Sequence, residues 1–105
     1  MKRFLLVIAV ATPCLLPNLA FAHHGPETVK LPAMMGEVTF QHYAHQDRVE
    51  DCTTCHHMGV EAGACRSCHG VKSEAPKAKD AFHTLCRDCH KKNDGPTKCG
   101  GCHKK

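Results

Sequence analysis

Apolar residues form one long run in this chain, and it lies near the amino terminus. Basic residues at positions 2 and 3 precede the run, which extends from Phe4 to Leu16 with an interruption at Pro13. The small-x-small sequence Ala20-Phe21-Ala22 follows it, an order that predicts a secretory signal peptide over residues 1–22. No later segment approaches the roughly 20 apolar residues that span a bilayer, so we expect a mature chain from about His23 without stable membrane insertion.

A second apolar pattern occurs between Asp80 and Lys91. Its spacing of i, i+3, i+4, i+7 and i+8 is typical of one face of a helix. That face carries Phe82, Leu85, Cys86, Cys89 and His90. We expect a short helix here, with Asp80 as its amino-terminal cap.

The sequence Cys-x-x-Cys-His occurs four times. The copies are Cys52-Thr-Thr-Cys55-His56, Cys65-Arg-Ser-Cys68-His69, Cys86-Arg-Asp-Cys89-His90 and Cys99-Gly-Gly-Cys102-His103. This is the attachment signature of c-type haem, because residues i, i+3 and i+4 of a helical turn share one face. The two thiols therefore reach the two vinyl groups of one haem, and the imidazole reaches its iron. Zinc ribbons and redox disulfides also use Cys-x-x-Cys, but a histidine after all four pairs favours haem.

The cysteine count agrees with an exported haem protein. The chain has nine cysteines, of which Cys14 leaves with the signal peptide and the other eight lie in the four motifs. Free thiols oxidise outside the cytosol unless another group binds them, and covalent haem does so. We expect a periplasmic protein, with extracellular release as the alternative.

The mature chain, residues 23–105, is one small domain with few residues for a core. It has no Trp, one Tyr and, of the phenylalanines, only Phe40 and Phe82. Four haems would leave about 21 residues for each, so we expect the cofactors to form the core of a tetrahaem domain. Regular secondary structure should be sparse, and the chain without haem should be unfolded.

Charge does not indicate a nucleic-acid-binding protein. Without Lys2 and Arg3 the chain has 12 basic and 10 acidic residues. Eight ionised haem propionates would make the net charge about −6. No basic stripe with interleaved aromatic residues is present, so we expect no nucleic-acid partner.

The histidines suffice for two axial ligands on every iron. The motifs provide His56, His69, His90 and His103, and four more histidines are available outside the amino-terminal pair: His42, His45, His57 and His83. These four are the candidate distal ligands, and a surface or packing role is the alternative for each.

The spacing of the histidines limits which of them share an iron. His56 and His57 are adjacent and point about 100° apart on a helix, so we expect them to serve two haems. His83 precedes His90 by seven residues, about 10 Å along a helix. Two ligands of one iron stand about 4 Å apart, so His83 should serve a haem other than that of the third motif.

Other side chains are weaker candidates. We expect His23 and His24 to lie in a mobile tail. A thioether ligand would raise the reduction potential, but packing is the expected role of Met34, Met35 and Met58.

The residues together resemble the class III multihaem cytochromes c, the tetrahaem cytochrome c3 group and its trihaem relatives. The matching features are Val38-Thr-Phe-Gln-His42-Tyr-Ala-His45, the doubled His56-His57, a lone His83 and the ending Lys98-Cys99-Gly-Gly-Cys102-His103-Lys-Lys. All four motif gaps are two residues long, whereas many tetrahaem members have longer second and fourth gaps. The carboxyl end resembles the trihaem branch.

The resemblance implies a fold and a set of ligand pairs. The fold is a small haem-organised domain with a short amino-terminal antiparallel hairpin, over Thr28 to Leu31 and Glu37 to Phe40, and a few short α-helices. Phe40 would lie against haem. The implied pairs are His42 with His56, His57 with His69, His45 with His90, and His83 with His103.

An iron with two histidine ligands has no open position, so the expected function is that of a low-potential electron carrier in anaerobic respiration, not an enzyme. The alternative is a small terminal reductase of metal ions or sulfur species. The resemblance implies redox partners such as periplasmic hydrogenase, formate dehydrogenase and membrane cytochrome complexes. We expect a monomer. Five lysines surround the fourth motif, and they form either a docking surface for a redox partner or an ordinary solvated surface: Lys91, Lys92, Lys98, Lys104 and Lys105.

Overall fold

The structure is a computed structural model, and it describes residues 22–105. The predicted signal peptide lies outside the described residues, apart from Ala22. Within the described part, no helix is both long enough and apolar enough to cross a membrane.

The described chain opens with a β-hairpin. Strand β1 (Thr28–Leu31) pairs antiparallel with β2 (Glu37–Gln41), and Val29 lies opposite Phe40. The connecting turn ends at Gly36, whose φ of 110° suits glycine because it has no Cβ. The hairpin expected from the resemblance is confirmed.

A two-residue strand at the carboxyl end completes the sheet, in the order β1-β2-β3. Strand β3 (His103–Lys104) pairs antiparallel with β2 and sets His103 opposite Val38. No pattern in the sequence predicted this strand. It joins the last motif to strand β2 of the hairpin, which lies at least 62 residues earlier in the chain.

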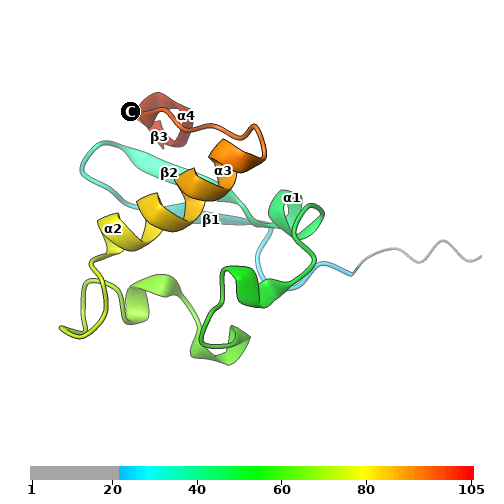
Figure 1. Cartoon of the computed structure of the whole chain (residues 1–105), viewed down its shortest axis with the longest axis horizontal. Coiled ribbons are helices and arrows are strands. Elements are labelled where there is room, and N and C mark those ends of the chain that lie inside the picture. The colour runs from blue at the N-terminus through cyan, green and yellow to red at the C-terminus, as the bar shows by residue number, and fades with distance from the viewer. Residues whose placement is uncertain (1–21) are drawn as a thin grey trace, which may run out of the picture.

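The central part of the chain consists of turns. Helix α1 (His42–Gln46) follows β2 directly, and three 3-10 turns come next: η1 (Cys52–Thr54), η2 (Val60–Ala62) and η3 (Cys65–Ser67). Figure 1 shows these green turns along the lower edge of the view, below α2 and α3, with the strands passing behind the helical segment.

A longer helical segment follows, at the place the apolar pattern predicted. It comprises α2 (Ala78–Phe82), a π-helical turn η4 (His83–Arg87) and α3 (Asp88–Lys92). Asp80 was expected as the cap, and this was wrong: Lys77 holds the cap position, and Asp80 lies in the first turn. The short helix α4 (Cys99–Cys102) leads into β3.

The described residues have no core of their own. Among residues 22–105 no side chain is buried, and Met58, Val60 and Val71 are all more than half exposed. An apolar interior normally stabilises a domain of this size. The fold therefore fits a chain whose interior is filled by bound groups.

Candidate haem-binding site

Each motif lies in a helical turn that gathers its two thiols and its imidazole. In the first motif the amide of His56 donates to the carbonyl of Cys52 at 2.8 Å, and in the second the amide of His69 donates to Cys65 at 2.9 Å. Such i to i−4 bonds place the histidine on the side of the first cysteine. The backbone thus presents three reactive side chains to one space.

Asp51 stabilises the first of these turns as its amino-terminal cap. Its carboxylate accepts from the Thr53 amide at 2.9 Å and from the Thr53 hydroxyl at 2.6 Å. The hydroxyl bond, followed by the amide bond, lowers the pKa of Asp51, because both favour the charged form.

The π-helical turn separates two histidines that a regular helix would align. Residues seven apart on an α-helix differ by only about 20° around the axis. A π-helical turn, which begins at His83, departs from this periodicity, and His83 is paired with His103 while His90 is paired with His45. The two rings therefore face different partners.

The structure brings all eight candidate histidines together as four pairs of rings. The ring centroids of His42 and His56 lie 6.4 Å apart, those of His45 and His90 6.0 Å, those of His57 and His69 5.8 Å, and those of His83 and His103 6.3 Å. Every pair joins one motif histidine to one histidine from outside the motifs. These are the same four pairs that the resemblance implies.

The ring spacing fits one metal ion between the two imidazoles of each pair. Two nitrogens bound on opposite sides of one iron stand about 4 Å apart. A further distance of about 1.2 Å from each nitrogen to its ring centre gives about 6.4 Å between centroids. The observed range of 5.8 to 6.4 Å matches this value.

Backbone carbonyls orient five of these imidazoles. A carbonyl only accepts, so the ring Nδ1 donates and Nε2 keeps the lone pair that binds a metal. The bonds run from His42 to Pro26 at 2.9 Å, His45 to Gln41 at 2.7 Å, His69 to Pro76 at 2.7 Å, His90 to Pro96 at 2.7 Å and His103 to Gly36 at 2.8 Å. This is the outer-shell arrangement expected of metal-binding histidines.

The cysteines surround a shared interior. Burial raises the pKa of the Cys86 thiol to about 11, and thiols of the other three motifs, Cys55, Cys102 and Cys65, add to the rise. Burial, with Cys65 and Cys89, also raises the pKa of Cys55.

The alternative uses of the cysteines find no support in residues 22–105. All eight cysteines there are free, and no group of three or more His, Cys, Asp or Glu side chains is arranged to hold a metal ion. A structural zinc site needs four such ligands. The paired imidazoles therefore remain the candidate metal ligands of the described residues.

The comparison with known families agrees with this geometry. The sequence model of the class III cytochrome c family matches residues 18–105. The chain belongs to the class III cytochrome c family. Members of the family transfer electrons through covalently bound haem, so this class III cytochrome is an electron-transfer protein.

Individual relatives of this cytochrome are cytochromes c7. One from Geobacter metallireducens is 36% identical over 99 residues, which cover 88% of this chain and all of that protein. The structure of PpcE, a cytochrome c7 from Geobacter sulfurreducens, has a TM-score of 0.56 at 30% identity and covers 74% of this chain and 97% of its own. The triheme cytochrome PpcA of the same organism has a TM-score of 0.55 at 35% identity, and the match covers 76% of this chain and 100% of the PpcA chain.

The number of attachment motifs in this chain can be compared with the haem number of PpcA, which is described as triheme. Four complete motifs are present here, each with a paired histidine. The second pair, His57 with His69, is formed entirely within the segment of 3-10 turns.

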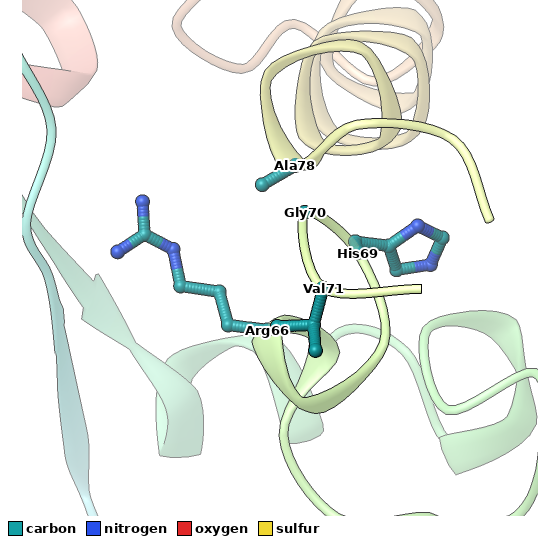
Figure 2. Close-up of a pocket in the computed structure, with 5 residues that line it drawn as sticks. All are labelled: Arg66, His69, Gly70, Val71 and Ala78. Atoms are coloured by element: carbon teal, nitrogen blue, oxygen red, sulfur yellow. The ribbon is translucent and has the colours of Figure 1, made fainter. Parts of the chain in front are cut away.

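An open pocket of about 250 Å³ lies beside the second motif. Arg66, His69, Gly70, Val71 and Ala78 line it. Figure 2 shows the imidazole of His69 and the guanidinium of Arg66 pointing in opposite directions from the turn at Gly70 and Val71. The His69 ring thus faces His57 and not the Arg66 side of the pocket.

The amino-terminal histidines differ from their prediction. His23 stacks on Tyr43 with centroids 4.3 Å apart, and its Nε2 contacts Asp47 Oδ1 at 2.7 Å. The His24 amide donates to Gln46 Oε1 at 3.0 Å. The expected mobile tail is instead held against α1, a contact that no periodic pattern in the sequence indicates.

The methionines also differ from expectation. Packing was expected for Met34, Met35 and Met58, but they are 105%, 58% and 73% exposed. No protein core holds them.

Proposed function

We propose that this class III cytochrome is a low-potential electron carrier that binds four haem c groups, each held by two cysteines and two histidines. The thioether-forming residues are Cys52, Cys55, Cys65, Cys68, Cys86, Cys89, Cys99 and Cys102. The axial ligands are the four histidine pairs. Haem c supplies a reversible one-electron iron couple.

The single observation that carries the proposal is the set of four ring pairs, each with one motif and one non-motif histidine. Two imidazoles leave no open position for a substrate, so the ligands permit electron transfer and exclude inner-sphere catalysis. Paired nitrogen ligands also favour the ferric state and a negative potential.

We propose the periplasm as the location and redox proteins as the partners. The basic start, apolar run and Ala-x-Ala sequence support export. Exposed Lys91 is 3.8 Å from Asp88, a weak surface pair, and it remains available for an acidic partner together with Lys92. Steering by these charges would bring the partner to the carboxyl-terminal motifs.

The haem-to-protein ratio tests the tetrahaem proposal. Intact mass and haem absorbance of the purified protein should give four haems per chain. Replacing both Cys65 and Cys68 with Ala should give three, because only the second attachment site is lost. A wild-type ratio of three would contradict the tetrahaem proposal and leave the membership of the family untouched.

A further inference from the structure

The third ring pair differs from the other three in its hydrogen bonds. Both of its imidazoles donate to backbone carbonyls, His45 to Gln41 and His90 to Pro96, each at 2.7 Å. In each of the other pairs only one ring does so. His42, His69 and His103 donate to backbone carbonyls. Within residues 22–105, their partners His56, His57 and His83 make no such bond.

An Nδ1 bond changes the ligand strength of an imidazole. The carbonyl draws the Nδ1 proton toward itself, which raises electron density at Nε2 and makes the ring a stronger donor to a metal. A stronger donor stabilises ferric iron more than ferrous iron and lowers the reduction potential. Two such rings on one iron act in the same direction.

A short turn formed by residues 93–96 holds His90 in this bond. The Gly95 amide donates to the His90 carbonyl at 2.9 Å while the next residue supplies the acceptor for Nδ1. A Cβ on Gly95 would lie 2.5 Å from Cγ and Cδ2 of the His90 ring, so only glycine fits against it. The turn is therefore shaped around the imidazole.

The same turn contains strained backbone. Asp94 has a φ of 57°, the only positive φ among non-glycine residues in the described part of the chain. Asn93 anchors the turn by donating from its side chain to the Cys89 carbonyl at 2.9 Å. Strain that persists next to a candidate ligand is consistent with a positioning role.

We infer that the 93–96 turn, through Gly95 and Pro96, makes the third motif the site of lowest potential among the four. The inference rests on the proposed function, since it requires iron between His45 and His90. Each site gains one electron per iron, with no bond made or broken at the ligands. Gly95 and Pro96 are positioning residues, because they act through His90.

A redox titration of the wild-type holoprotein, followed by NMR of each haem's methyl groups, gives the order of reduction. The expected result is that the third motif is reduced last. Its Nδ1 protons, on His45 and His90, should also exchange with solvent more slowly than that of His56. Reduction of any other site last, or fast exchange at both Nδ1 positions, would overturn the inference.

Gly95→Ala tests the turn directly, because a Cβ there would lie against the His90 ring, and the other three sites of the same variant serve as the control. At the potential where the wild-type third site is half reduced, Gly95→Ala should raise its reduced-to-oxidised ratio at least threefold. That is about 28 mV at 59 mV per tenfold change. A third site that shifts no more than the other three sites would overturn the inference.

These outcomes separate the inference from the proposed function. If the wild type holds four low-spin haems but the order differs, only the role of the turn fails. If it does not hold four, the proposed function fails first. Should Gly95→Ala not mature, the wild-type order and the Nδ1 exchange rates still decide the inference.

Discussion

At the scale of single residues, the imidazole pairs explain why this chain has so many histidines. Each pair joins residues between 12 and 45 positions apart, such as His83 with His103 and His45 with His90. The ring centroids match the spacing required by one iron, and a backbone carbonyl orients at least one ring in each pair. Loss of one ring should therefore open one iron and leave the rest closed.

His83→Ala is the sharpest test at this scale. The variant should keep four haems, but one of them should bind carbon monoxide after reduction, because its distal ligand is missing. His24→Ala is the control, since no histidine ring is paired with His24 in the described chain. A His83→Ala protein that ignores carbon monoxide would contradict the pairing with His103.

At the scale of elements, the contact of β3 with the hairpin positions the fourth pair. The Gly36 carbonyl accepts from His103 Nδ1 at 2.8 Å, so the same residue closes the hairpin turn and orients a ligand. A Cβ on Gly36 would meet the carbonyl oxygen of Lys104, and its φ of 110° is unfavourable for other residues.

Gly36→Ala should therefore destabilise the holoprotein by about 1–3 kcal/mol, through backbone strain and separation of β3 from β2. Thermal unfolding of the variant and of the wild-type holoprotein measures the change. A melting temperature equal to that of the wild type would show that β3 does not depend on this close approach.

Some of these elements could be predicted from the sequence, and others could not. The hairpin and the helix near Asp80 were predicted, the first from the resemblance and the second from apolar spacing. Strand β3 was missed because two residues have no periodicity and pair only after tertiary approach. The π-turn, the 93–96 turn and the contact of His23 with Tyr43 depend on three-dimensional packing, which local patterns do not record. The spacing predicted that His83 and His90 bind different irons, but the partner of each histidine came only from the family resemblance.

At the scale of the whole molecule, residues 22–105 have no buried side chains, which agrees with the proposal that haem groups fill the interior. Small domains without an apolar core require another source of stability, and covalent haem is a large apolar group. The surface then determines which partner reaches which site. The exposed lysines at the carboxyl-terminal end of α3 are the part of this surface that we propose as the docking site for an acidic partner.

Replacing Lys91 and Lys92 with Glu should slow electron transfer from an acidic donor about tenfold at low ionic strength. The difference should shrink as salt rises above roughly 0.1 M, where charges are screened. Replacing Lys72 and Lys77 with Glu makes the same change in net charge at a different place. Identical stopped-flow rates for the two double variants would contradict docking at α3.

The most direct test of the tetrahaem, paired-histidine arrangement is the visible spectrum of the purified wild-type protein. It is recorded oxidised, reduced, and reduced under carbon monoxide. Two imidazoles on every iron predict sharp low-spin bands that carbon monoxide leaves unchanged. A shift of the Soret band under carbon monoxide would reveal an iron with an open position and would contradict the closed electron carrier.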